Sequence, residues 1–429
     1  MVVRETKNRE WLFILFLLLC IFQVPLALNF GIFAYYDELI PFLIIPVMII
    51  DLIRAKGSKW YPKKLLAIMC LLIVFWVIGW ISWSRSHLMP FKNGFLDSFA
   101  NLKFYISIVV SWLLFKEIDY EHLWKLLWNI LRAITLILFV LTIFDEIFHI
   151  FPGEFRYGIM CIRLFFGHYT LMVAACVLMC SIFIRMYEFY KERVLPWILM
   201  QFVMLFFTMR TKAWLALLAF AVLYFYVCRK RRKISKVAWL VVILMVVVIS
   251  FNQVSYYFVE LGEESARYFL IVTSPVIARD FFPLGSGWAT FGSGFSAEPY
   301  SPIYSMYNIN YVWGLTIDRP AYISDCFWPM ILAETGLFGL LTYASALLIL
   351  LKGVFDLGKK NAYAFASALG ALAYLIIAST SEASFTLGYA SHFGIWLGII
   401  FAESNGRIRF LPMRKTLGYD DSKRLTAHL

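Results

Sequence analysis

The sequence predicts an all-α, polytopic integral membrane protein with about twelve transmembrane helices and one large extracytoplasmic loop. Of its 429 residues, 62% are hydrophobic and only 15% are charged. Soluble domains contain about 45–50% apolar and about 25% charged residues, so a water-soluble globule is excluded. Apolar runs of transmembrane length follow one another from end to end of the chain. We therefore expect residues 1–429 to form a single transmembrane domain.

Apolar segments long enough to cross a hydrocarbon core of about 30 Å define the expected spans. They are residues 11–29, 32–53, 65–83, 101–115, 123–144, 162–184, 194–209, 213–228, 237–257, 326–351, 362–380 and 385–403. No small-residue cleavage pattern follows the first segment, so we expect a retained span rather than a signal peptide. The cysteines show no CxxC or metal-ligand spacing, so we expect no function for them in redox chemistry or metal binding.

The distribution of lysine and arginine predicts the orientation of these spans. The formal net charge is +12, and with the N-terminus inside most basic residues fall in cytoplasmic segments. Both termini, the basic run Arg229 to Lys233 and the basic tail 407–429 are then cytoplasmic. Because the charge reports topology, we expect no nucleic-acid partner.

One predicted outside segment, residues 258–325, is much longer than the other connections, and binding residues concentrate in such loops. Its part Ser265–Trp288 has the apolar spacing of an amphipathic helix lying at the membrane surface, and the glycine-containing PLGSG ends that helix. Arg267 and Arg279 stand near the ends of its apolar face. This loop is where the sequence indicates a functional site.

Basic residues that lie outside against the general trend are candidate anion-binding groups. Arg210 and Lys212 occupy a very short turn between two spans, and Lys103 opens another span. The other members of this outside set are Arg85, Arg156, Arg163 and Arg319. The planar fork of an arginine binds pyrophosphate well, so the set indicates an anionic lipid-linked substrate. Pairing with lipid phosphate is the alternative for any one of them.

Aromatic residues fill the second part of the loop. They are Trp288, Phe291, Phe295, Tyr300, Tyr304, Tyr307, Tyr311, Trp313 and Tyr322. Aromatic faces suit the apolar faces of sugar rings, which makes the tyrosines candidate glycan-binding residues. An interfacial aromatic belt is the alternative, and the spacing of Tyr304, Tyr307 and Tyr311 also fits one face of a short helix.

Acidic residues near the end of the loop are candidates for proton transfer. Asp325 is the candidate general base, although it could instead cap the span that follows. Glu334 lies half a turn away on that span, so the two carboxylates cannot share one face. His168, Glu382 and His392 lie near span ends, where either internal pairing or substrate contact explains a polar residue. The chain has no nucleotide or metal motif, so we expect no cofactor and no metal.

Several stretches together resemble the O-antigen polymerase and O-antigen ligase superfamily of bacterial polytopic membrane glycosyltransferases. They are LDSFANLKFYIS, FFGHYT, TMRTKAWLALL, SARYFL with FFPLGSGWATF, and SDCFWPMILAETGLFGLL, over roughly residues 97–340. The resemblance implies metal-independent transfer of an undecaprenyl-pyrophosphate-linked glycan, with Arg210 and Arg267 binding the pyrophosphate. Ligases of the family typically have a histidine where this chain has Asp325, which favours a polymerase.

We therefore expect a polymerase of surface polysaccharide, either O-antigen or capsule, that joins repeat units by inverting displacement. It would act at the extracytoplasmic face of the bacterial cytoplasmic (inner) membrane. The expected catalytic residues are Asp325, Arg210 and Arg267, and the expected substrate-binding residues are Lys103, Lys212, Arg279, His168, Tyr300, Tyr304 and Tyr307.

The expected partners are the undecaprenyl-pyrophosphate-linked donor and acceptor glycans, the lipid bilayer, a flippase and a chain-length regulator. One alternative function is an O-antigen ligase that passes finished glycan to a lipid or other acceptor. The other is a flippase for lipid-linked oligosaccharides, which should carry basic residues along a central cavity rather than at the outer surface.

Overall fold

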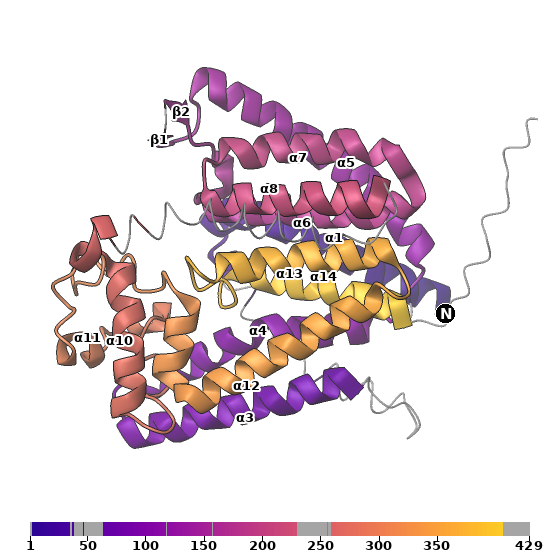
Figure 1. The fold of residues 1–429 in the computed structure, drawn as a ribbon. Helices are drawn as coiled ribbons and strands as arrows, with labels where there is room; N and C mark the ends of the chain where they lie inside the picture. Colours follow the sequence, from indigo (N-terminus) through magenta and orange to yellow (C-terminus); the bar gives the residue numbers. More distant parts are fainter. Residues whose placement is uncertain are drawn as a thin grey trace, which may run out of the picture.

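The computed structural model is almost entirely helical, as the sequence predicts (Figure 1). It describes residues 2–34, 37, 46, 63–116, 118–156, 158–229, 255 and 259–405. Within these residues the strands are limited to a two-stranded antiparallel hairpin of β1 (Phe155–Arg156) and β2 (Ile159–Met160). The predicted tail 407–429 and most of the expected spans 32–53 and 237–257 lie outside the described residues.

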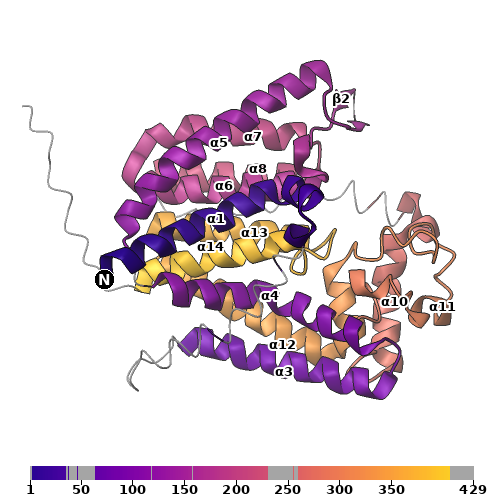
Figure 2. The same ribbon diagram turned by 180° about the vertical axis from the view of Figure 1, so that it is seen from behind.

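Helices packed side by side form the body of the molecule, and two further helices lie together at one end (Figures 1 and 2). The helices of the body are α1 (Val2–Asn29), α3 (Lys63–Ser86), α4 (Phe91–Phe115), α5 (Tyr120–Phe148), α6 (Tyr169–Tyr190), α7 (Leu195–Phe207), α8 (Thr211–Leu223), α12 (Phe327–Leu357), α13 (Ala362–Ala378) and α14 (Gly388–Asn405). At the end are α10 (Ala266–Asp280) and α11 (Pro302–Met306). α10 packs against α12, and this contact joins the end region to the body.

The number of spans differs from the expectation. Among the described residues, six helical segments are long and apolar enough to cross a membrane, or seven if the bent α1 counts as one span. One of the six is the continuous segment Tyr169–Phe207, in which α6 and α7 count together. α13 has 17 residues, fewer than the roughly 20 that a hydrocarbon core requires. The structure thus supports a membrane protein, but the count of twelve is not confirmed.

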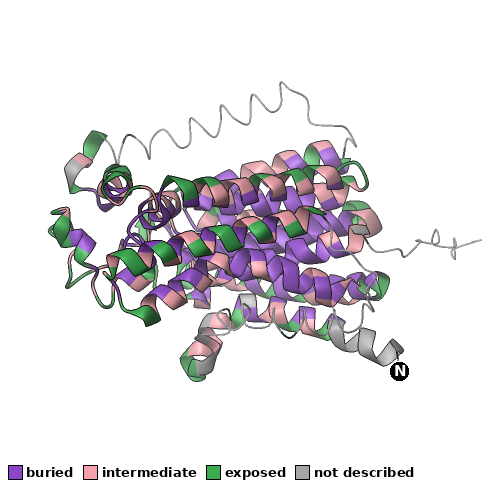
Figure 3. Cartoon of the chain, turned by 90° about the horizontal axis from the view of Figure 1, so that it is seen from below, coloured by how far each residue is buried: buried purple, intermediate pink, exposed green. Residues whose placement is uncertain are grey.

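Burial divides the helices into central and peripheral ones (Figure 3). α6 is buried along nearly its whole length, whereas α3 exposes apolar side chains such as Ile73, Val77 and Ile81. Exposed apolar residues on a long helix are what a lipid environment favours. The central helices therefore form a protein core, and α3 presents a face suited to lipid.

Helix boundaries correct two expectations about site residues. The sequence predicts Lys103 at the start of a span, but α4 begins at Phe91 and places Lys103 inside the helix, where it is buried. The polar residues Asp97, Ser98 and Asn101 interrupt the apolar run there, yet all three are buried in the structure. The sequence also predicts His168 inside a span, whereas it is the N-cap residue just before α6.

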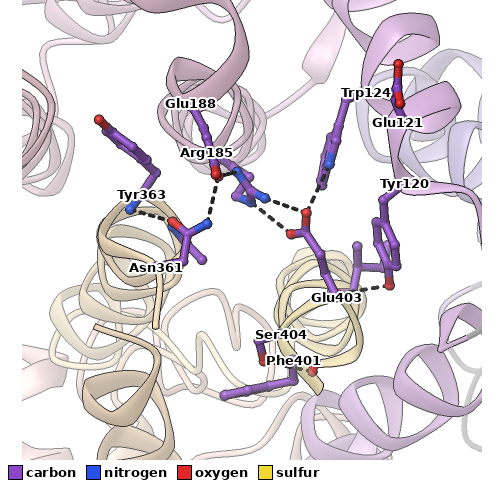
Figure 4. A network of polar contacts seen from close by, with 12 residues as sticks. Tyr120, Glu121, Trp124, Arg185, Glu188, Asn361, Tyr363, Phe401, Glu403 and Ser404 are labelled. Atoms are coloured by element: carbon purple, nitrogen blue, oxygen red, sulfur yellow. Dashed lines mark hydrogen bonds and ion pairs between the residues drawn. The ribbon is translucent and has the colours of Figure 1, made fainter. Parts of the chain in front are cut away.

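Away from α10 and α11, a buried arginine ties four helices of the body together (Figure 4). Arg185 of α6 binds Glu403 of α14 through Nε at 2.8 Å and Glu188 through Nη1 at 2.6 Å. Trp124 of α5 donates to Glu403 at 3.1 Å, and Asn361, the N-cap of α13, donates to Glu188 at 2.7 Å. Removing one partner of such a buried pair typically costs about 3–5 kcal/mol. This network therefore stabilises the helical core.

The orientation of the chain can be tested by cysteine labelling in intact cells. In a parent variant whose exposed Cys70 is replaced by serine, we expect Ile317→Cys to react with an impermeant thiol reagent, because Ile317 is 66% exposed in the predicted outside loop. Lys359→Cys, at a position with a 79% exposed side chain between α12 and α13, should react only after the cells are permeabilised. Labelling of Lys359→Cys in intact cells would invert the predicted orientation.

Candidate functional site

Residues that are far apart in the sequence meet where several helices begin. His168 is the N-cap of α6, Arg210 is the N-cap of α8, and Arg267 lies in the first turn of α10. Asp325 directly precedes the N-cap of α12, and Glu382 lies in the connection between α13 and α14. Helix N-termini carry unpaired N–H groups and partial positive charge, which favour bound anions. We call these five residues together with Lys212 the charged cluster.

The central contact of the charged cluster is an ion pair between Arg267 and Asp325. The Nη2 atom of Arg267 lies 3.0 Å from Oδ2 of Asp325, and it also donates to the carbonyl of Ser381 at 3.3 Å. The side chains of Arg267 and Asp325 are 13% and 29% exposed. Ser265 caps α10 by accepting from the Tyr268 N–H, which fixes the first turn that carries Arg267. The predicted pyrophosphate ligand and the predicted base are therefore direct neighbours.

Asp325 does not cap the helix that follows it. The N-cap residue of α12 is Cys326, and no side chain makes a capping hydrogen bond there. The capping alternative for Asp325 is therefore wrong. Its carboxylate instead forms an ion pair with Arg267 of α10, which is a different segment of the chain.

A second ion pair joins Lys212 to Glu382. Lys212 also donates to Oγ1 of Thr170 at 2.6 Å, and this hydroxyl donates to Glu382 at 3.0 Å. The hydroxyl of Tyr389 completes the set of donors around the Glu382 carboxylate. Glu382 thus belongs to the charged cluster, although sequence reasoning left it out of the expected site. Its one signal was an acidic residue placed between two apolar segments.

Arg210 lies at the edge of the charged cluster and keeps part of its guanidinium available. It makes an ion pair with Glu154 at 3.2 Å, and its guanidinium carbon lies 4.0 Å from the centre of the Tyr169 ring. Its side chain is 21% exposed, and within the described residues its buried Nε has no hydrogen-bond partner. Glu154 is 57% exposed, so an incoming anion can replace this partner at little cost.

The charges of the cluster influence one another's protonation. Burial raises the pKa of Asp325 above its ordinary value, while the neighbouring Arg267 opposes that rise. Burial also lowers the pKa of His168, and the nearby Lys212 lowers it further. His168 is therefore neutral at pH 7. Because its Nδ1 accepts from the Thr170 N–H at 3.2 Å, the neutral ring carries its proton on Nε2 and can act there as a donor.

The remaining basic residues expected at the site lie elsewhere. Lys103 makes a buried ion pair with Asp37 at 2.6 Å, beside the start of α14. Arg279 lies at the opposite end of α10 from Arg267, is 76% exposed and pairs with its neighbour Asp280 at 3.0 Å. Lys103 thus supports the packing of α4, and Arg279 is separated from the charged cluster by the length of α10.

The three expected glycan-binding tyrosines support the loop from within. The hydroxyl of Tyr304 accepts from the Gly292 N–H at 2.9 Å and contacts Ser296 at 2.8 Å, and its ring is fully buried. Tyr300 donates to the carbonyl of Leu315, and Tyr307 donates to Asp280 at 3.1 Å. The exposed aromatic residues described in the same loop are Phe282, Tyr311 and Trp313, at 65%, 66% and 57%, and the last two belong to its second, aromatic part.

Two cavities of the described part of the chain lie away from the charged cluster. One, of about 310 Å³, is lined by Lys63, Lys64, Asp356, Lys360 and apolar residues of α3, α4 and α12. The other, of about 160 Å³, is an apolar groove between α3 and α4. Among the described residues, no group of three histidine, cysteine, aspartate or glutamate side chains is arranged to hold a metal ion. The expectation of metal-free chemistry stays a prediction.

Comparison with known proteins agrees with the resemblance read from the sequence. A family model described as O-antigen ligase matches residues 196–344, the part that carries Arg210, Lys212, Arg267 and Asp325. No curated protein matches the chain. The resemblance is thereby confirmed, since this match supports membership of the superfamily of O-antigen ligases and polymerases.

Proposed function

We propose that this protein is a polymerase of a surface polysaccharide, which joins glycan repeat units carried on undecaprenyl pyrophosphate. The observation that carries the proposal is the charged cluster, in which three cations and two carboxylates meet where helices begin. Such a cluster suits a substrate that presents a pyrophosphate beside an attacking hydroxyl group. The family match supports an enzyme that acts on lipid-linked glycans.

Arg210 and Arg267 would bind the pyrophosphate and stabilise the charge that grows on it as the glycosidic bond breaks. Donors aimed at developing charge in a site of low dielectric are among the largest contributions to catalysis. Lys212 acts on the same region, since its charge influences both His168 and Asp325. The neutral His168 would donate its Nε2 proton to a phosphate or sugar oxygen. No metal ion is required for these roles.

Asp325 would accept the proton of the acceptor hydroxyl group. In the structure, Arg267 holds this carboxylate in an ion pair at 3.0 Å. A pyrophosphate that engages Arg267 competes for the same guanidinium and adds negative charge nearby. Both effects raise the pKa of Asp325, which makes it a stronger base when the donor is bound. Direct attack by the activated hydroxyl then inverts the anomeric carbon.

The glycan would lie against the exposed aromatic residues Tyr311 and Trp313. Trp313 packs edge-on against Tyr322, and Arg319 lies over its ring. Tyr300, Tyr304 and Tyr307 hold the loop that presents these two rings. We therefore propose Tyr311 and Trp313 as sugar contacts in place of the buried Tyr304 and the partly buried Tyr300 and Tyr307.

A ligase is the second candidate function, because the matching family model is described as O-antigen ligase. Asp325 at the position where ligases typically have a histidine favours the polymerase. A flippase is disfavoured, since the cations of the charged cluster meet where helices begin, and neither of the two cavities described above is lined by them. The flippase and chain-length-regulator partners, the side of the membrane and the inner-membrane location remain part of the proposal.

The phenotype of a deletion separates polymerase from ligase. If the protein is a polymerase, cells that lack it should carry single repeat units attached to the final acceptor, visible as one short band in glycan electrophoresis. Loss of a ligase should instead leave long chains on the polyprenyl carrier. Complementation with the wild-type gene is the control, and accumulation of long unattached chains would reject the polymerase.

Arginine-to-lysine variants test the proposed pyrophosphate ligands. We expect Arg210→Lys and Arg267→Lys to reduce polymer formation at least tenfold, because lysine keeps the charge but loses the planar fork of donors. Arg279→Lys is the matched control, since Arg279 lies on the same helix as Arg267 but 76% exposed and away from the charged cluster. Polymer length and amount should be compared at equal protein level in membranes. Near-normal polymer from either test variant would remove that arginine from the site.

Substitution of Asp325 tests the proposed base. Asp325→Asn retains an acceptor for Arg267 but cannot take up a proton at neutral pH, so we expect activity to fall by about 10²–10⁴ with normal membrane insertion. Asp325→Ala should be no more active. Because Cys326 and not Asp325 occupies the N-cap of α12, neither variant loses a helix cap. An active asparagine variant would show that Asp325 serves only to hold Arg267.

The pH dependence of the wild-type enzyme follows from the same group. The base acts only when ionised, so the rate should rise with pH as Asp325 loses its proton. Since burial raises the pKa of Asp325, this rise should lie at higher pH than an ordinary aspartate would give. The residual activity of Asp325→Asn should lack the rise. An unchanged acid limb in that variant would assign it to another group.

A further inference from the structure

The larger of the two cavities described above has no part in the proposed chemistry. Its volume is about 310 Å³, and buried apolar side chains form its inner wall, among them Ile68 of α3, Ile108 of α4 and Leu350 of α12. It lies at the end of α12, whereas Asp325 directly precedes the start of that helix. At about 1.5 Å per residue, the segment from Gly336 to Leu357 alone is about 30 Å long, the thickness of a hydrocarbon core. The cavity is therefore separated from the charged cluster by about the thickness of a membrane.

Lysine side chains lie at the exposed part of the cavity wall. Lys63 and Lys64 begin α3, and Lys360 follows the end of α12. Asp356 is the one acidic residue in the lining, and it pairs with Lys64 and with Lys359. Three lysines against one carboxylate give the opening of the cavity a net positive charge, and Lys63 has no ion-pair partner among the described residues. The opening therefore suits a ligand group that carries negative charge.

An apolar groove adjoins the cavity along α3, the helix whose exposed face is suited to lipid. Ile68 and Ile108 line the cavity, and the residues that follow them, Met69 and Val109, line the groove of about 160 Å³ between α3 and α4. The other side chains that line the groove are apolar or aromatic. An apolar surface of this kind marks a place where an apolar ligand binds. The cavity and the groove thus combine a cationic opening with apolar walls.

We propose that this cavity binds an anionic glycerophospholipid of the bilayer, with its phosphate at the lysines and an acyl chain against the apolar walls. A soluble phosphate compound would pair with the lysines but leave the apolar walls uncovered. A zwitterionic lipid would cover the walls but bring no net charge to the lysines. The basic tail 407–429 is an unsuitable occupant, because its lysine and arginine residues add like charge. In the orientation that the sequence predicts, this end of α12 is cytoplasmic, where anionic lipids give the membrane surface a negative potential.

Native mass spectrometry of the purified full-length protein tests the contribution of the lysines. The protein in detergent is titrated with palmitoyl-oleoyl phosphatidylglycerol, or with phosphatidylcholine that carries the same acyl chains. We expect one phosphatidylglycerol to bind about tenfold or more tightly than phosphatidylcholine. Lys63→Gln and Lys360→Gln should each weaken phosphatidylglycerol binding about fivefold, the usual contribution of a lysine beside anionic lipid. Lys352→Gln is the matched control, because Lys352 is exposed on α12 but does not line the cavity.

Substitution of Gly353 tests the contribution of the apolar space. Gly353 of α12 lines the cavity, and a Cβ atom on it would lie 3.5 Å from the Phe401 ring, an ordinary contact distance. Gly353→Ala should therefore fold and bind phosphatidylglycerol as the wild type does. We expect Gly353→Leu, whose longer side chain occupies the cavity, to weaken binding about tenfold or more. Thermal unfolding without added lipid shows whether Gly353→Leu is folded, and the lysine variants test the site without any change in the core.

Equal binding of the two phospholipids, or lysine variants that bind phosphatidylglycerol as well as the Lys352→Gln control, would overturn the proposal. Unchanged binding by a folded Gly353→Leu would do the same. Competition by inorganic phosphate, which lacks an acyl chain, or preferential binding of undecaprenyl phosphate would also reject a bilayer phospholipid as the occupant. Because lipid binding is measured on the purified protein without substrate, these results do not depend on whether the protein is a polymerase.

Discussion

The break in α12 at Gly336 is the constraint on which the arrangement of the site depends. A continuous helix would use the carbonyls of Ala333 and Glu334 internally, whereas the break releases them to accept from Ser286 and Gly287. A buried carbonyl without a partner is costly, so the loop after α10 must dock there. Docking fixes α10 against α12, and the first turn of α10 then carries Arg267 to Asp325.

The cations of the charged cluster are all held in ion pairs, but their partners differ in burial. Arg210, Lys212 and Arg267 each have a carboxylate partner among the described residues. The partners differ in burial, since Glu154 is 57% exposed and Glu382 only 12%. An anion that approaches the cluster would therefore displace Glu154 more easily than Glu382. In the proposed function, this difference suits Arg210 to first contact with the substrate and Lys212 to a fixed electrostatic role.

The end of the helical body opposite the charged cluster contains the buried Arg185 and its partners. Arg185 is fully enclosed and satisfied by Glu403 and Glu188, and aromatic rings of Trp124 and Phe189 lie within 5.2 Å of its guanidinium carbon. The two carboxylates differ in burial, since the side chain of Glu403 is 6% exposed and that of Glu188 is 37% exposed. The helices α5, α6, α13 and α14 converge on this enclosed cation, whereas Arg210 and Arg267 of the charged cluster are partly exposed.

The sequence by itself determined the helical class and the short turn that carries Arg210, because both follow from local hydropathy. It also singled out Arg267 and Asp325 as candidate site residues, through the order of the motifs along the chain. It could not decide which charged residues meet. Arg267 and Asp325 are 58 positions apart and Lys212 and Glu382 are 170 apart, so each pair forms only when different helices pack. The burial of Tyr304 and Lys103 also depends on packing, since aromatic and basic residues look alike in sequence whether they face a substrate or a partner. The tertiary structure therefore decided which residues pair with each other, whereas periodicity and composition could predict only the helices and their apolar faces.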